Sequence, residues 1–267
     1  MRLENCAMAA LAVVIGYVVA GGTDLGLPAG YLIGLALAAV SAFLITGAGN
    51  AVNDYYDREA DKSNAPERPI PSGDVSANGA AYAAAALFCA GVVLSIFINW
   101  ACLALAAFNS LALFFYARNL KSSVFTGNVT VSYLTASTFI YGALVLGSPA
   151  ATIFLALLAF LANVGREIIG DVEDIEGDKK AGMKTLAIRF GAKRSWALGR
   201  AYITGAVLLS PVPYLTGMLG AYYLILVLAA DALFVASIAT NDARRNQKLT
   251  KMAIFAGLLA FLVGAVV

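Results

Sequence analysis

The stretch LIGLALAAVSAFLITGAGNAVNDYYDREADK, residues 32–62, changes from apolar to acidic within one predicted helix. Its first part, 32–53, has the length of a membrane-spanning helix, which needs about 20 mostly apolar residues. Three aspartates follow at positions i, i+3 and i+7: Asp54, Asp57 and Asp61. Residues at these spacings lie on one face of a helix. If the helix continues through them, we expect a carboxylate face where the chain leaves the membrane.

The same spacing returns in GDVEDIEGDK, residues 170–179, as Asp171, Asp174 and Asp178. This triplet also follows an apolar run and is also followed by a lysine. Six carboxylates gathered at one membrane surface repel one another strongly unless cations bridge them. Mg²⁺ is typically bound through a few carboxylates together with phosphate oxygens. The two triplets therefore predict a site that holds a phosphate-bearing substrate through Mg²⁺.

The composition is that of an integral membrane protein. The 267-residue chain is 61% hydrophobic and 13% charged, with a mean hydropathy of +0.81. No soluble domain of this size is expected to have such values. The net charge of +2 does not favour a nucleic-acid partner, and the absence of histidine excludes Ser–His catalysis and His-ligated zinc or haem. We expect one transmembrane domain over residues 1–267.

Hydropathy predicts an all-α fold with nine membrane spans. Each predicted span is an uninterrupted apolar run of helical length, and turn residues such as Gly147, Pro149 and Gly217 separate several of them. The predicted spans are 3–20, 32–53, 77–96, 101–118, 125–146, 150–170, 195–215, 219–240 and 249–267.

The charge distribution supports this count and predicts the orientation. All 18 Lys and Arg residues fall before the first span or at the ends and loops after spans two, four, six and eight. The positive-inside rule then places the N-terminus and both aspartate triplets on the cytoplasmic side, and the C-terminus outside. The repeated triplet suggests two parallel four-helix repeats plus a ninth helix.

Other polar residues accompany each triplet. In GNAVNDYYDREADKSNAPERPIPSG, residues 49–73, Asn50 lies one helical turn before the first aspartate and Asn53 adjoins it, while Arg68 follows in a predicted turn. In REIIGDVEDIEGDKKAGMKTLAIRFG, residues 166–191, Arg166 and Glu167 lie inside the apolar boundary, where ionisable groups indicate function. Solvated helix ends are the plainer alternative, which the matched pair of triplets disfavours.

The motif NDxxDxxxD followed by RPIPSG, together with DxxDxEGDxxxGxxTL, resembles the UbiA superfamily of intramembrane prenyltransferases. The resemblance covers the whole chain. It implies a nine-helix bundle with a central cavity, two Mg²⁺ ions and a polyprenyl diphosphate donor. The positions that match the family motifs are Asn53, Asp54, Asp57, Asp61, Asp171, Asp174 and Asp178.

The implied chemistry needs cations and aromatic surfaces as well as carboxylates. An allylic diphosphate ionises when the charge of its leaving group is neutralised, which Mg²⁺ and cationic side chains achieve. Arg68 and Lys121, in predicted cytoplasmic loops, are the candidates for direct contact with the diphosphate. Tyr116, Tyr133 and Tyr141 are candidates for lining the prenyl cavity, because aromatic faces stabilise a carbocation.

The second motif most resembles that of the archaeal ether-lipid branch, the geranylgeranylglyceryl phosphate geranylgeranyltransferases. This resemblance implies geranylgeranyl diphosphate as donor and a phosphorylated glycerol monoether as acceptor, whose phosphate Lys179, Lys180 and Lys184 are candidates to contact. An aromatic or quinone-precursor acceptor remains an alternative. A cation transporter is an alternative of another class, which the parallel repeat and the one-sided acidic clusters disfavour.

Two further expectations concern the membrane interior. Because both substrates carry long apolar chains, we expect a cavity that opens sideways into the bilayer, flanked by the first and last helices, where Gly257 and Gly264 leave little bulk. Asp231 lies midway along the eighth span, and we expect it to make a structural hydrogen bond between helices.

Overall fold

The computed structural model describes residues 3–21, 28–180 and 182–266, and every regular element in these ranges is helical. The long helices are α1 (Leu3–Val19), α2 (Ala29–Asn64), α3 (Ala77–Ile96), α4 (Trp100–Phe115), α5 (Thr126–Leu144), α6 (Ile153–Glu173), α9 (Ala192–Leu209), α11 (Ala221–Ala239) and α12 (Ala243–Val266). The short elements are η1 (Tyr116–Leu120), η2 (Pro149–Thr152), α7 (Ile175–Lys180), α8 (Leu186–Phe190) and α10 (Val212–Leu215).

Each predicted span falls on one of the long helices. Six helical segments among the described residues are long and apolar enough to cross a membrane: Ala29–Glu59, Ala77–Ile96, Trp100–Leu120, Ile153–Glu173, Ala221–Ala239 and Ala243–Val266. Helix α1 is apolar but shorter. Helix α5 carries several serines and threonines, and α9 begins with Lys193 and Arg194, which lowers the hydropathy of both. The chain is therefore a multi-pass helical membrane protein.

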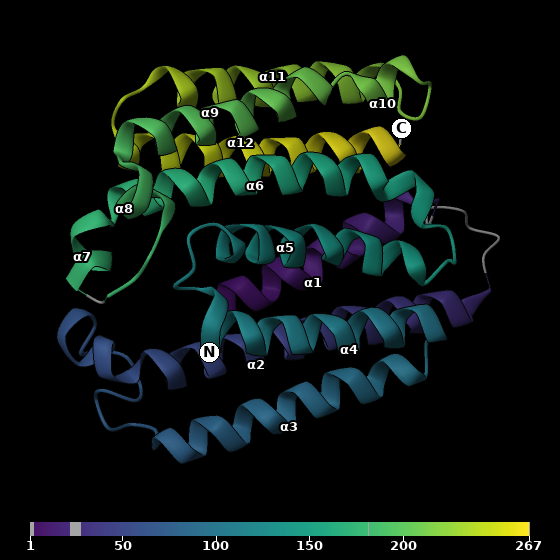
Figure 1. Cartoon of the computed structure of the whole chain (residues 1–267). Coiled ribbons are helices and arrows are strands. Elements are labelled where there is room, and N and C mark those ends of the chain that lie inside the picture. The colour runs from purple at the N-terminus through teal and green to yellow at the C-terminus, as the bar shows by residue number, and fades with distance from the viewer. Residues whose placement is uncertain (1–2, 22–27, 181, 267) are drawn as a thin grey trace.

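Small residues bring the helices into close contact. A Cβ atom on Gly142 of α5 would lie 1.9 Å from the carbonyl oxygen of Val13 in α1, so the two backbones touch there. A Cβ atom on Gly165 of α6 would lie 2.6 Å from the carbonyl oxygen of Gly199 in α9. Membrane helices associate closely where such residues meet, because lipid supplies no hydrophobic drive between helices. These contacts place α1 against α5, and α6 against α9 (Figure 1).

The two largest buried apolar clusters among the described residues lie inside the bundle. One joins α1, α2, α4 and α5 around residues such as Val13, Ala42 and Ala106. The other joins α1, α5, α6, α9, α11 and α12 around residues such as Ile169 and Ile203. Since α1 and α5 belong to both clusters, they hold the two parts of the bundle together.

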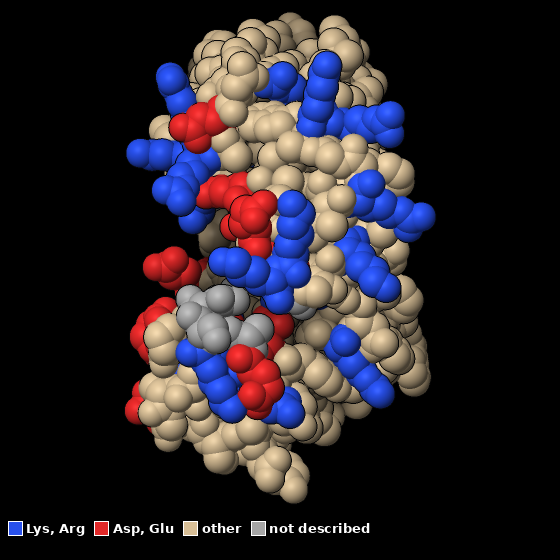
Figure 2. Space-filling view, turned by 60° about the vertical axis from the view of Figure 1, so that its left-hand side comes forward, with Lys and Arg blue, Asp and Glu red and all other residues tan. Residues whose placement is uncertain are grey.

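The polar end of the bundle carries both aspartate triplets. The C-terminal end of α2 lies at the same end as α7 and α8, and the two chain ends lie toward opposite ends of the bundle (Figure 1). Viewed from the α7 side, acidic side chains run through the middle of this face with Lys and Arg around them (Figure 2). The expectation that both triplets open on one side of the protein agrees with this arrangement.

Candidate active site

The first triplet lies on an unbroken helix, as the spacing predicted. Helix α2 continues to Asn64, so Asp54, Asp57 and Asp61 all belong to it. The chain then turns back in RPIPSG, where the Ser72 amide donates to the Arg68 carbonyl at 2.9 Å. This turn places the Arg68 guanidinium next to the C-terminal end of α2.

Arg68 pairs with the first triplet. Its Nη1 donates to Asp61 Oδ2 at 2.6 Å and lies 3.9 Å from Asp54 Oδ1. Burial lowers the pKa of Arg68, but the carboxylates of Asp61, Asp54 and Asp57 outweigh this effect and raise it above its ordinary value. The guanidinium is therefore a permanent cation at the acidic helix end.

Lys121 reaches the same carboxylates from a different part of the chain. It follows η1, a π-helical turn at the end of α4, and its amide donates to the Tyr116 carbonyl at 2.9 Å. Such turns are frequent at functional sites. Lys121 Nζ donates to Asp57 Oδ2. Both cations predicted from the sequence thus lie against the first aspartate triplet.

The loop that carries Lys121 is fixed to the second motif. The Lys184 amide donates to the Ser122 carbonyl at 3.0 Å, and Phe125 packs in a cluster with Ile168 and Leu186. Lys121 also acts on the second triplet. Burial and the charge of Asp174 raise the pKa of Asp178, while the Lys121 ammonium opposes that rise. The charge of Lys121, which is bonded to Asp57 of the first triplet, thus also acts on the second triplet.

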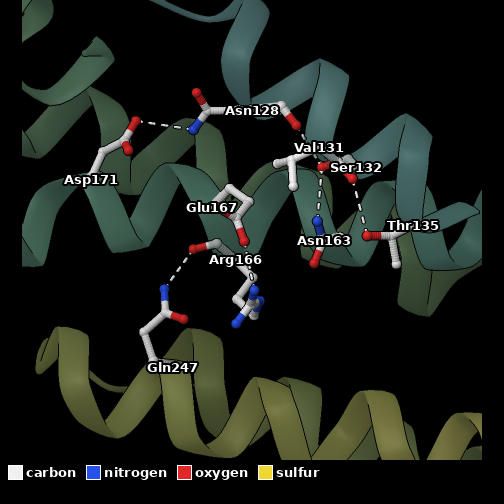
Figure 3. A network of polar contacts seen from close by, with 9 residues as sticks. All are labelled: Asn128, Val131, Ser132, Thr135, Asn163, Arg166, Glu167, Asp171 and Gln247. Atoms are coloured by element: carbon white, nitrogen blue, oxygen red, sulfur yellow. Dashed lines mark hydrogen bonds and ion pairs between the residues drawn. The ribbon is translucent and has the colours of Figure 1, made fainter. Parts of the chain in front are cut away.

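The second triplet differs from the expected continuous face. Helix α6 ends at Glu173, Asp174 adopts φ −95° and ψ 6° at the break, and α7 begins at Ile175. The Asp178 amide still donates to the Asp174 carbonyl at 2.8 Å, so helical hydrogen bonding resumes directly after the break. Asp171 stays on α6, where its Oδ2 accepts from Asn128 Nδ2 of α5 at 3.0 Å (Figure 3).

The polar atoms at this end suit a hard cation. Asn53 Oδ1 is buried and accepts no hydrogen bond within the described residues, while Asn50 Nδ2 donates to Cys6 Sγ of α1 at 3.8 Å. Carboxylate and amide oxygens are ligands that Mg²⁺ accepts. In the described ranges, no three acidic, Cys or His side chains are close enough together to hold a metal ion unaided. Instead, Arg68 and Lys121 lie against the carboxylates, as cations compensating negative charge.

An apolar pocket of about 890 Å³ lies between α4, η1, α5 and α6. Phe108 and Tyr133 form part of its wall, with their rings edge to face at 5.8 Å, and Arg118 and Asn119 of η1 supply polar atoms. The remaining lining residues are Ala112, Phe115, Leu120, Val129, Thr130 and Phe160. The position of Tyr133 agrees with its prediction as a cavity residue.

The first and last helices, which were predicted to flank a lateral opening, lie away from this pocket, so that opening stays a prediction. Neither α1 nor α12 contributes to the lining of the pocket. Helix α1 packs against α2 and α5, and a Cβ atom on Gly264 of α12 would lie 2.6 Å from Tyr223 Cβ. Gly264 therefore lies where α12 packs closely against α11.

The other two tyrosines predicted as cavity residues do not line this pocket. Tyr141 is buried in the core, with its hydroxyl 2.7 Å from Ser95 Oγ and 3.0 Å from Ser41 Oγ. It joins α5 to α2 and α3, and its role in lining the prenyl cavity stays a prediction. Tyr116 is partly buried at the first position of η1, outside the lining of the pocket.

The three lysines predicted to meet an acceptor lie on the exposed end of the bundle. Lys179 and Lys180 end α7, and Lys179 Nζ lies 3.3 Å from Glu176 Oε1. Lys184 is exposed in the segment before α8.

Sequence reasoning missed Asn128 because no spacing links it to Asp171; the contact exists only once α5 packs on α6.

Asp231 makes the structural hydrogen bond that was expected. Its Oδ2 accepts from Ser210 Oγ at 2.6 Å, and Tyr223 Oη donates to the Ser210 carbonyl at 2.6 Å. Ser210 caps the end of α9, so the contact joins α9 to α11.

Comparison with known proteins defines the class. The chain matches the UbiA prenyltransferase family over residues 8–263. It is 44% identical over 266 residues to the digeranylgeranylglyceryl phosphate synthase of Methanopyrus kandleri, covering 98% of this chain and 96% of that protein. The chain therefore belongs to the UbiA prenyltransferase family, and its enzymatic class excludes the transporter alternative.

Solved structures agree. A structure described as that of digeranylgeranylglyceryl phosphate synthase in membranes superimposes with a TM-score of 0.85 at 35% identity, covering 99% of this chain and 95% of that one. A UbiA homologue from Archaeoglobus fulgidus, bound to GPP and Mg²⁺, superimposes with a TM-score of 0.69 at 17% identity, covering 97% of each chain. The latter likeness shows the fold.

Proposed function

We propose that this prenyltransferase transfers a geranylgeranyl group from geranylgeranyl diphosphate to geranylgeranylglyceryl phosphate in archaeal ether-lipid synthesis. The observation that carries the reaction class is the convergence of Arg68 and Lys121 on one acidic helix end. Full-length identity of 44% to a digeranylgeranylglyceryl phosphate synthase supports the choice of acceptor.

The carboxylates are proposed to hold the donor through Mg²⁺, which neutralises the diphosphate as it leaves. The ligands would be drawn from Asp54, Asp57, Asp61, Asp171, Asp174 and Asp178, with Asn50 and Asn53 beside them. Arg68 and Lys121 are the cations for direct contact. Each is about one-third exposed, so each can exchange a carboxylate for a diphosphate oxygen. Preorganised cations stabilise the charge that develops on the leaving group.

The apolar pocket is proposed to take the prenyl chain. Phe108 and Phe115 on its wall are exposed large apolar residues, so the pocket opens toward the lipid rather than toward the bundle axis. A chain that enters from the bilayer avoids exposing its methylenes to water, which costs about 0.8 kcal/mol each. Tyr133 on the wall of the pocket would present an aromatic ring to the chain, and Tyr116, which precedes the lining residues of η1, is proposed to lie toward the diphosphate end.

The acceptor is proposed to arrive at the polar end of the bundle. Lys179, Lys180 and Lys184 lie there and are exposed, which suits attraction of a phosphate headgroup. An aromatic or quinone-precursor acceptor is the second candidate, and it gives these lysines no phosphate to attract.

The proposal also includes an arrangement of the chain in the membrane. We propose nine spans in two parallel four-helix repeats plus one helix, within a single domain over residues 1–267 in the cell membrane. The Lys and Arg distribution favours a cytoplasmic N-terminus and active site and an external C-terminus.

The test is an assay of purified protein with Mg²⁺ and geranylgeranyl diphosphate, with and without geranylgeranylglyceryl phosphate. We expect diphosphate release to require the acceptor and to match formation of the phosphorylated diether, identified by mass spectrometry. Diether formation that fails while an aromatic acceptor is prenylated would contradict the proposed acceptor.

A further inference from the structure

Helix α6 carries two opposite charges inside its apolar length. Arg166 Nη2 donates to Glu167 Oε1 at 2.6 Å, and the helix qualifies as a membrane span from Ile153 to Glu173. An ionised side chain costs about 2.5–3.5 kcal/mol at the centre of a span on insertion scales, and less toward its end, where this pair lies. Residues of this kind usually line a substrate path or a water-filled cavity. The donor site described above uses neither of them.

Glu167 lies on a polar face of α6. Asn163, Glu167 and Asp171 are spaced by four residues, so they form one stripe along α6. Asn163 Nδ2 donates to Ser132 Oγ of α5 at 3.1 Å, and Asp171 accepts from Asn128 of α5 at 3.0 Å. Glu167 lies between these two contacts, one turn from an aspartate of the proposed donor site.

Arg166 is held from the other side. Gln247 Nε2 of α12 donates to the Arg166 carbonyl at 2.6 Å. Figure 3 shows the side chains of Arg166 and Glu167 in the space between α5 and α12. The helix backbone is therefore fixed at this point, while the two charged groups extend away from it.

The charged groups are open to a ligand. The Arg166 and Glu167 side chains are 32% and 27% exposed. Glu167 is the partner of the Arg166 guanidinium within the described residues, which leaves most of its five N–H donors available. Asp231, which lies midway along α11, is by contrast 8% exposed and bonded to Ser210, as is expected of a structural group.

We propose that Arg166 and Glu167 bind the polar head of the acceptor in its reacting position: Arg166 holds the phosphate, and Glu167 removes the proton from the hydroxyl. This inference rests on the proposed function. The hydroxyl oxygen bonds to C1 of the geranylgeranyl group as the bond from C1 to the diphosphate oxygen breaks. The hydroxyl proton moves to the Glu167 carboxylate, and the diphosphate leaves with the bonding electrons.

The geometry of the pair suits this ligand. A guanidinium binds phosphate through two parallel N–H bonds. The phosphate and the free hydroxyl of the acceptor belong to one three-carbon glycerol. They can therefore reach the adjacent Arg166 and Glu167 side chains at the same time. The exposed lysines at the bundle end would then attract the headgroup, and Arg166 would fix it.

The experiment compares wild type with Glu167→Gln, Glu167→Asp and Arg166→Lys. Glu176→Gln is the matched control, because it neutralises a glutamate of an exposed ion pair with Lys179. Each protein is checked by size exclusion and thermal unfolding. Donor binding is measured with labelled geranylgeranyl diphosphate in the absence of acceptor. Transfer is measured with geranylgeranylglyceryl phosphate and with its unphosphorylated analogue.

Glu167→Gln should lower kcat by about 10²–10⁴-fold, the usual contribution of a general base, with donor binding unchanged. Glu167→Asp should recover part of this loss. Arg166→Lys should raise KM for the phosphorylated acceptor at least tenfold and raise KM for the unphosphorylated analogue much less.

Variants that behave like Glu176→Gln, or that lose donor binding in proportion to transfer, would overturn the proposal. If Glu167→Gln does not fold, Glu167→Asp decides: an unchanged kcat overturns the assignment. A wild type that transfers nothing to the phosphorylated acceptor refutes the proposed function itself. A wild type that transfers normally beside unaffected variants refutes this inference alone.

Discussion

Removing Arg68 should destabilise the protein by an amount that its surroundings allow us to estimate. Its guanidinium lies 2.6 Å from Asp61 Oδ2, and the two side chains are 31% and 8% exposed. Breaking a fully buried ion pair costs about 3–5 kcal/mol, whereas an exposed pair is worth about 0–1 kcal/mol. For Arg68→Ala we therefore expect a loss of about 2 kcal/mol, because the aspartate keeps its charge and loses its partner.

The assay is thermal unfolding in detergent, where this loss corresponds to roughly 4–8 °C in apparent melting temperature for a protein of this size class. The double variant Arg68→Ala/Asp61→Asn should recover most of the stability, since no uncompensated buried charge remains. Added Mg²⁺ should partly restore the single variant by replacing the lost cation. The matched control is Arg244→Ala, whose pair with Glu173 leaves the arginine 87% exposed and should change stability little.

A melting temperature for Arg68→Ala equal to that of Arg244→Ala would refute this reasoning. So would a double variant that is no more stable than Arg68→Ala. Activity should separate from stability: the double variant should regain its fold but not its donor affinity, because it lacks the cation proposed to meet the diphosphate.

Three other predictions follow from single contacts. Lys121→Ala should raise KM for the donor more than KM for the acceptor in steady-state kinetics, and an effect on the acceptor alone would reassign the residue. Asn128→Ala removes a charge-assisted hydrogen bond to Asp171 and should lower kcat/KM about tenfold with the fold intact, which an unchanged kcat/KM would contradict. Ser210→Ala leaves Asp231 buried without its donor and should destabilise the protein by about 1–3 kcal/mol while KM stays constant; a changed KM would place Asp231 near the substrate.

The sequence predicted those features that depend on local pattern. Apolar runs mark helices in lipid because the backbone must satisfy its own hydrogen bonds there. The triplet spacing predicted a carboxylate face on α2, and the position of Arg68 in a short turn after the helix limited how far it lies from that face. Lys121 lies far from Asp57 in sequence, although the two side chains are in contact. Its place at the site was therefore predicted from the resemblance to a known family and not from local spacing.

Features that depend on which helices touch were not predictable from one sequence. A membrane helix that is apolar on all sides does not reveal which face meets a neighbour. The hydrogen bonds from the Tyr141 hydroxyl to serines of α2 and α3 were therefore not predicted. The break between α6 and α7 was likewise not predicted, because neither Asp174 nor its immediate neighbours are proline or glycine. Gly177 lies farther along, within α7. The pocket between α4 and α5 depends on the same packing.

The most direct test of the central claim is product formation by wild type, Asp54→Asn and Asp171→Asn, each with Mg²⁺ and with EDTA. The matched control is Asp74→Asn, a substitution at an exposed aspartate of the loop between α2 and α3. Wild type and Asp74→Asn should form the phosphorylated diether with Mg²⁺ and lose activity in EDTA, while Asp54→Asn and Asp171→Asn should be inactive although they fold. Full activity in EDTA, or in either variant of the two triplets, would contradict the claim that both triplets serve one metal-dependent transfer.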